Sequence, residues 1–163
     1  LSARAYGGAQ ERRRLILTAA LRAPIELVPH LAVDPLSIAD CLLPDDTQGL
    51  EWTPIASKPA GMANRMRAAQ REAGRRCFWS NVDSARGRPL DGPFPTVTTK
   101  SAGQFYLLDR DRCRLLEPRE LARAQSFPDS YQLPEERTLA GKLIGNAIDT
   151  RLAEGVVAQV LAA

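Results

Sequence analysis

Glycine and proline turns interrupt the middle of this chain so often that no long strand fits there. The 163 residues include 12 prolines and 11 glycines. Segment 24–60 is rich in Pro, Asp and Gly, so we expect loops with short turns. Segment 76–116 alternates β-favouring residues with Gly and Pro, which predicts two or three irregular strands. The sequence therefore predicts a small, irregular, β-rich region at its centre.

Two segments flanking these strands have the pattern of helices. Residues 61–76 predict one helix, with Gly74 as its stop. Its apolar residues recur near helical spacing at Met62, Met66, Ala69 and Ala73. Residues 117–127 predict another, because Pro118 suits the first position of a helix, Glu120 suits the third, and Pro128 ends it.

The two ends of the chain predict one strand and one helix. Residues 12–21 form a short apolar run entered through three arginines, which predicts a strand. Alternation along it puts Arg12 and Arg14 on one face and Arg13 on the other. Residues 149–163 predict an amphipathic helix that Asp149 or Thr150 can cap.

Composition and charge place the chain among globular domains. Hydrophobic residues make up 44% and charged residues 25%, and the net charge of +3 permits a nucleic-acid partner without demanding one. The basic residues cluster in 12–14 and 65–76. A run of arginines alone most often forms a solvated surface, and the second cluster suits an exposed helix face and phosphate contact equally.

Cysteine and histidine offer little sign of a metal or disulfide site. The three cysteines are widely spaced, with no second Cys or His at a metal-ligand spacing, which favours a reducing cytoplasm. His30 follows Pro29 in an expected loop and has no evident partner. No apolar run is long enough to cross a bilayer, so we expect no membrane association.

Three separated segments resemble motifs of one family, the DNA cytosine-5 methyltransferases. The stretch YGGAQERRRL is similar to the family's Gln-x-Arg-x-Arg motif, and LLEPRELARAQSFPDSY to its Pro-Arg-Glu helix. The stretch GKLIGNAIDTRLAEGV resembles its Gly-Asn-Ala motif. Thr96 and Val97, in PFPTVTT, look like the end of the family's target recognition region. Each motif alone is weak, but their order and spacing agree.

The resemblance implies an α/β fold in two parts. Residues 1–23 would belong to the edge of a doubly wound, Rossmann-like lobe that uses S-adenosylmethionine. Residues 24–112 would form the small, irregular, β-rich target recognition domain. Residues 113–163 would return to the catalytic lobe through the Pro-Arg-Glu helix and the C-terminal helix.

The resemblance also implies a reaction, in which a methyl group moves from S-adenosylmethionine to C5 of a cytosine flipped out of duplex DNA. Arg14 would donate hydrogen bonds to the base, with Arg12 beside it or supporting it. Contact with the cofactor is implied for a turn at Gly145 and Asn146, and for Ala147. The residues expected to contact DNA are Gln10, Arg75, Arg76, Arg86, Arg88, Thr96 and Val97.

The motifs of the family's first half do not occur in these 163 residues. There is no Pro-Cys nucleophile, no Gly-rich cofactor loop after a first strand and no Glu-Asn-Val. We therefore expect the C-terminal part, or the small subunit, of a bacterial or phage-encoded methyltransferase of restriction-modification type. It would be inactive without an N-terminal half, and prone to associate through exposed apolar surface. The alternative is a non-catalytic DNA-binding module that retains the recognition region.

Overall fold

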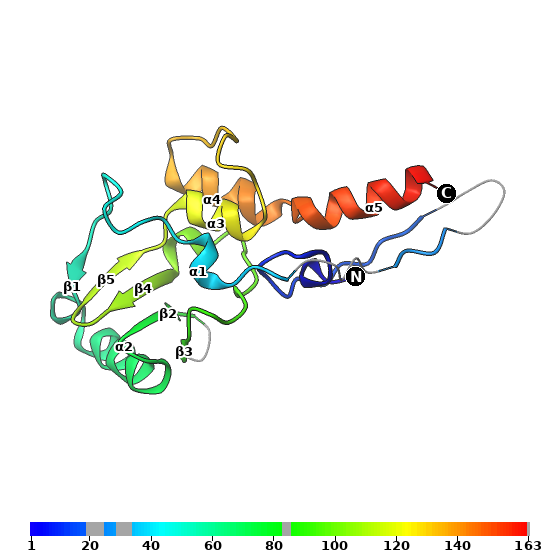
Figure 1. Ribbon diagram of the computed structural model, residues 1–163. Coiled ribbons are helices and arrows are strands. Elements are labelled where there is room, and N and C mark those ends of the chain that lie inside the picture. The colour runs from blue at the N-terminus through cyan, green and yellow to red at the C-terminus, as the bar shows by residue number, and fades with distance from the viewer. Residues whose placement is uncertain (19–24, 29–33, 83–85, 163) are drawn as a thin grey trace.

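An antiparallel sheet of five strands lies at the centre of the structure, a computed structural model that describes residues 1–18, 25–28, 34–82 and 86–162 (Figure 1). The strand order is β1-β5-β4-β2-β3, and every neighbouring pair is antiparallel. The strands are β1 (Thr53–Pro54), β2 (Arg76–Ser80), β3 (Gly87–Arg88), β4 (Phe105–Asp109) and β5 (Arg112–Leu115). Strands over 76–116 are thus confirmed, although four of them, β2 to β5, lie there in place of the two or three predicted.

Each face of this sheet is covered by a different set of helices. Cys77 and Trp79 of β2 point to one face, where they pack against Met66 of α2 (Ala60–Ala73). Phe78 points to the other face, into a core shared with Leu121 of α3 (Pro118–Ala124). Side chains of α1 (Ile38–Cys41) and α4 (Arg137–Asn146) join this second core. Because successive side chains of β2 point to opposite faces of the sheet, this one strand contributes to both hydrophobic cores.

The predicted helices are confirmed, with small changes at their ends. Helix α2 ends before Gly74, whose φ of 95° lies in the left-handed region that glycine tolerates. Helix α3 begins at Pro118 but ends at Ala124, three residues before the expected end. The last helix, α5 (Thr150–Ala162), begins where the sequence predicted. Short 3₁₀ turns occupy η1 (Ala3–Tyr6), η2 (Ile55–Ser57) and η3 (Ser101–Gly103).

The strand predicted over 12–21 is wrong for its described part, residues 12–18. Only Arg13 makes a β-bridge, to Ser2. Leu15 and Leu17 are each 86% exposed, since no neighbouring strand in the described residues covers them. Burial still alternates as expected, with Arg12 and Arg14 less exposed than Arg13. No doubly wound parallel sheet is present among the described residues, and positions 19–21 and His30 lie outside them.

Helix α4 was missed by the sequence analysis, which expected a turn at Gly145–Asn146. Those two residues end α4 instead, and the chain turns over Ala147–Asp149 before α5. The side chain of Asp149 caps α5, because its Oδ1 accepts hydrogen bonds from the backbone N–H of Arg151 and Leu152. A short helix with this weak amphipathic pattern is specified more by its packing than by its composition.

Helix α5 and the N-terminal segment extend together away from the sheet (Figure 1). Tyr6 of η1 packs with Leu152 of α5, and its ring lies where a Cβ on Gly155 would be. Farther along, the Gln159 amide exchanges hydrogen bonds with the backbone N–H and carbonyl of Val28, at 2.7 and 2.9 Å. Among the described residues, no helix has the length and apolar character to span a membrane.

Candidate functional site

The side chain of Gln10 lies fully buried between three distant segments of the chain. Its amide nitrogen donates to the carbonyl of Ala124 at 3.1 Å and to Oε1 of Gln125 at 2.7 Å. Its amide oxygen accepts from the backbone N–H of Val97 at 3.1 Å. The DNA contact expected of Gln10 does not fit this arrangement, because the side chain is enclosed and its polar atoms are engaged. Val97, also fully buried, can contact DNA no more than Gln10 can.

Arg12 ties the same segments together from the next position on that face. Its two terminal nitrogens donate to the carbonyl of Val97 at 2.7 Å and to that of Gly145 at 2.9 Å. The residue is only 9% exposed. Burial, reinforced by the nearby charge of Arg14, lowers the pKa of the Arg12 guanidinium, while Asp149 opposes that shift. Of the two roles expected for Arg12, the geometry favours support over direct contact with a base.

Gln125 completes this buried polar network on the side of α4. Its amide nitrogen donates to the carbonyl of Ile144 at 2.8 Å and to that of Ala147 at 3.3 Å. The backbone carbonyl of Gln125 accepts a hydrogen bond from the backbone N–H of Thr150, at the start of α5. Gln125 and Gln10 are fully buried, so each hydrogen bond also satisfies a group that water cannot reach. We call Gln10, Arg12 and Gln125 the buried polar network.

Arg14 differs from Arg12 in having an accessible side chain. Its backbone pairs with that of Leu1, and one guanidinium nitrogen donates to the carbonyl of Arg13 at 2.8 Å. That hydrogen bond is solvent exposed, so it can be exchanged for another acceptor at little cost. Arg14 is therefore the arginine of the motif whose donors remain available to a ligand.

The Gly145–Asn146–Ala147 segment gives each residue a different environment. A Cβ on Gly145 would lie 2.3 Å from the backbone of Thr98 and Thr99, so this glycine allows α4 to pack on that loop. The space that Gly145 leaves is therefore filled by the backbone of the protein, and not by a cofactor. Asn146 is exposed at the end of α4, where its amide can both donate and accept. The side chain present that fits contact with a cofactor is thus Asn146.

A cleft of about 700 Å³ opens between the N-terminal motif and the sheet. It is lined by residues that include Glu11, Ser80, Arg88, Thr96, Lys100 and Gln104. The cleft brings together two of the predicted DNA contacts, Thr96 and Arg88. Two further expected contacts near β2 and β3, Arg75 and Arg86, are exposed to solvent but do not line this cleft.

Arg76, the remaining expected DNA contact, is held by acidic partners. Its guanidinium pairs with both carboxylate oxygens of Asp45, at 2.6 and 2.8 Å. This hydrogen bonding raises the pKa of Arg76 and lowers that of Asp45. A phosphate could be bound by Arg76 only in competition with Asp45, which weakens its case as a contact.

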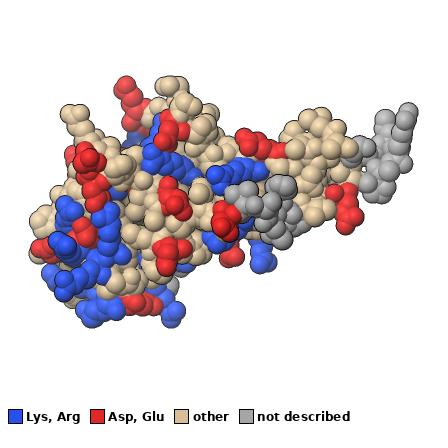
Figure 2. Space-filling model, viewed as in Figure 1, with Lys and Arg blue, Asp and Glu red and all other residues tan. Residues whose placement is uncertain are grey.

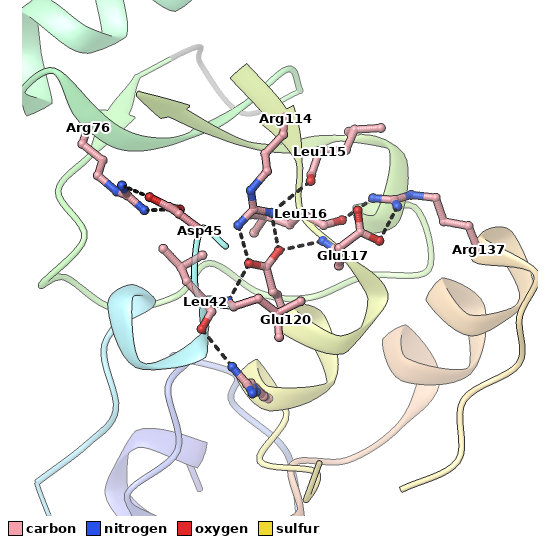
Figure 3. Close-up of polar contacts among 11 residues, drawn as sticks. Leu42, Asp45, Arg76, Arg114, Leu115, Leu116, Glu117, Glu120 and Arg137 are labelled. Atoms are coloured by element: carbon pink, nitrogen blue, oxygen red, sulfur yellow. Dashed lines mark hydrogen bonds and ion pairs between the residues drawn. The ribbon is translucent and has the colours of Figure 1, made fainter. Parts of the chain in front are cut away.

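A buried ion pair that the sequence analysis did not identify joins β5 to α3 (Figure 3). Arg114 and Glu120 meet through two hydrogen bonds of 2.7 and 2.6 Å, and both side chains are at most 1% exposed. Glu120 also accepts from the backbone N–H of Leu43 and of Glu117. Nearby, Arg137 of α4 donates to Glu117 and to the carbonyl of Leu116. Glu120 thus holds the sheet, through β5, against α3.

The signal for this pair was present but incomplete. Glu120 stands at the third position of a helix, where a carboxylate reaches back to the first N–H group, and this was expected. Its pairing with Arg114 depends on the side of β5 that faces α3, which sequence spacing alone does not indicate.

None of the three cysteines offers a reactive thiol. All are buried, and burial raises the pKa of Cys41 to about 12 and that of Cys77 to about 11. Cys113 lies in the core beneath α2. Within the described residues, no group of His, Cys, Asp and Glu could hold a metal ion.

Comparisons with known proteins identify the family of the chain. A family model described as C-5 cytosine-specific DNA methylase matches residues 48–162, more than half of the chain. The chain is also 32% identical over 62 residues to the Type II methyltransferase M.HgiCI of Herpetosiphon aurantiacus, an alignment covering 38% of this chain and 15% of that protein. The Type II methyltransferase M.BanI of Aneurinibacillus aneurinilyticus matches at the same identity over 14% of its length. The aligned segment thus spans only a small part of either relative, but the family match shows that the chain belongs to the C-5 cytosine-specific DNA methylases.

Proposed function

We propose that this chain is the C-terminal part, or the small subunit, of a DNA cytosine-5 methyltransferase of restriction-modification type. The observation that carries the proposal is the buried polar network. Gln10 bonds to Gln125 and to the backbone of Val97, and Arg12 bonds to the carbonyls of Val97 and Gly145, so four separated motif segments converge on one place. A plain basic surface would have no need of such a network.

The proposed roles follow from what each side chain can reach. Arg14 donates to the flipped cytosine of a duplex and balances charge as the adduct forms on the ring. Arg12 supports the site by holding the backbone at Val97 and Gly145, and Asn146 contacts the cofactor. S-adenosylmethionine supplies the methyl group when it is bound. Thr96 and Arg88, in the cleft, bind the DNA beside the extruded base.

The nucleophile in this proposal comes from an N-terminal half, in the same polypeptide or in a separate subunit. Thiolate is the reactive form of cysteine, and the two raised pKa values make it scarce here at neutral pH. The absence of Pro-Cys from the sequence points the same way. The partner half would also supply the glutamate and the Gly-rich loop.

The test is complementation. The chain is mixed with the N-terminal half of a family member, and transfer of a radiolabelled methyl group from S-adenosylmethionine to duplex DNA is measured. We expect transfer only with both parts present, and its loss in Arg14→Ala. Arg13→Ala is the matched control, because Arg13 is exposed on the other face.

The other outcomes separate the alternatives. If duplex DNA is bound but no partner half restores transfer, the chain is a non-catalytic DNA-binding module. If Arg14→Ala transfers methyl groups as well as the parent chain does, the role proposed for Arg14 is wrong even though the family assignment stands.

A further inference from the structure

We propose that α2 and the turn between β4 and β5 form a second contact surface for duplex DNA, which binds phosphates outside the cleft. This α2 basic surface consists of Arg67, Arg71, Arg75 and Arg110. The inference rests on the proposed function in one respect, that duplex DNA is the substrate. It goes further because it assigns contacts with the DNA phosphates beside the target base to residues that belong neither to the motifs nor to the cleft.

The charge of the chain is concentrated at this surface. Residues 58–76 contain six Lys or Arg and a single acidic residue, Glu72, whereas the whole chain carries a net charge of only +3. The remainder of the chain is therefore net acidic. Figure 2 shows many Lys and Arg side chains over α2 and the adjoining end of the sheet, with fewer acidic residues among them. Such a one-sided distribution attracts a polyanion.

The arginines of this surface make no ion pair with any described residue, unlike several other arginines of the chain. Arg76, Arg112 and Arg123 each pair with an aspartate at 2.6 to 2.8 Å. Within the part of the chain that the structure describes, no ion pair engages Arg67, Arg71, Arg75 or Arg110. All four are exposed. A phosphate can bind them without displacing a carboxylate.

Gln70 holds three segments of this surface together. Its amide nitrogen donates to the carbonyl of Arg75 at 2.9 Å and to that of Arg110 at 2.6 Å. The backbone N–H of Arg110 in turn donates to the carbonyl of Arg75 at 2.9 Å. Arg110 adopts a φ of 54°, in the left-handed region. The backbone at Arg75 and Arg110, and at Arg71 next to Gln70, is therefore held in place before any ligand binds.

The distance to the cleft suits a single duplex. Strand β2 runs from Arg76, next to this surface, to Ser80, which lines the cleft. At about 3.3 Å per residue its ends lie about 13 Å apart. Along B-DNA that length corresponds to about four base pairs, given one phosphate per strand about every 3.4 Å. The α2 basic surface would thus bind the backbone a few base pairs from the target cytosine.

The experiment measures how salt affects binding of the chain to a fluorescent duplex. We compare the parent chain with Arg67→Ala/Arg71→Ala/Arg75→Ala on a duplex of about 30 base pairs, from about 50 to 300 mM salt. Each lost phosphate contact lowers the slope of log K against log salt by about 0.9, so we expect a fall of about 2 to 3 and a loss of affinity of at least about tenfold. Circular dichroism checks that α2 remains helical, as alanine favours.

The matched control is the corresponding triple Lys variant. It keeps the charges, so its salt slope should equal that of the parent chain. A triple Ala variant with parental affinity and slope overturns the inference. So does one that keeps its DNA slope but no longer binds the N-terminal half, since the surface would then dock protein.

The same proteins separate this inference from the proposed function. If complementation restores methyl transfer while the triple Ala variant binds DNA with the parental slope, the inference fails and the proposed function stands. If no partner restores transfer but the slope falls as expected, the surface is real and the enzyme proposal fails.

Discussion

At the scale of single residues, Arg12 and Arg14 occupy one face of the chain but differ in their surroundings. Arg12 is enclosed and donates to two carbonyls, whereas the guanidinium of Arg14 is bound only through an exposed hydrogen bond to its neighbour. The sequence placed both arginines at the site by their alternation. Only the packing of Val97 and Gly145 around one of them separates support from contact.

A stability measurement tests that difference. Arg12→Met should lower the free energy of unfolding by about 1–3 kcal/mol, because the carbonyls of Val97 and Gly145 lose their buried donors. Arg14→Met should change it by no more than about 0.5 kcal/mol, since its side chain makes no buried contact. Urea unfolding measures both values. Equal losses in the two variants would contradict the assignment.

Asp149 gives a second prediction at this scale, in its pH dependence. Burial raises the pKa of the Asp149 carboxyl above that of the unfolded chain, about 3.9, although hydrogen bonds from Leu152 and Ser126 oppose the shift. The folded chain therefore binds this proton more tightly, so its stability falls as pH rises from about 4 through the raised pKa.

Asp149→Asn removes the titration but keeps a residue able to cap α5. Relative to this variant, the parent chain should lose stability between about pH 4 and pH 7, by about 1.4 kcal/mol per unit of pKa shift. Urea unfolding at both pH values tests this. A difference between the two proteins that does not change with pH would count against it.

At the scale of elements, the site depends on how closely α4 lies against the loop at Thr98–Thr99. The missing side chain of Gly145 permits this approach. Arg12 then fixes it by bonding the Gly145 carbonyl. The predicted turn at this position was wrong because the motif resemblance specified which residues occur there, and not that a helix carries them into contact with the loop at Thr98–Thr99.

Gly145→Ala tests this contact. The new Cβ would lie 2.3 Å from backbone atoms of Thr98 and Thr99, so we expect a loss of about 1–3 kcal/mol in unfolding free energy. Gly61→Ala is the matched control, because that helical glycine has nothing within 4 Å of its would-be Cβ. Gly61→Ala should stabilise the chain by about 0.5–1 kcal/mol, as alanine favours helix. Thermal unfolding of the two variants tests the tight contact at Gly145, and equal effects of the two substitutions would contradict it.

At the scale of the whole molecule, apolar surface is left uncovered along the extension formed by α5 and the N-terminal segment. Leu15 and Leu17 are each 86% exposed, Leu161 is 81% exposed and Val157 is 54% exposed. Of the apolar stripe of α5, Leu152 is the member that is fully buried, against η1. An uncovered surface of this kind marks an interaction site. The proposed N-terminal half would cover it.

We therefore expect the chain to self-associate when produced alone, by light scattering at micromolar concentration. Leu15→Gln/Leu17→Gln should shift it towards monomer, since it removes apolar area without touching the core. Addition of the N-terminal half should have the same effect on the parent chain. A parent chain that stays monomeric and soluble would argue that this surface needs no partner.

The sequence by itself determined the kinds of elements and the order of the motifs. Apolar spacing, the stop at Gly74, Pro118 at a first helical position and the cap at Asp149 placed three helices, because these are local signals that act within a few residues. The tertiary structure decided the rest. It showed that residues 12–18 form no strand, that Gln10 is buried, and that Glu120 pairs with Arg114. These outcomes depend on which distant segments pack together, and a strand exists only where a neighbour accepts its hydrogen bonds.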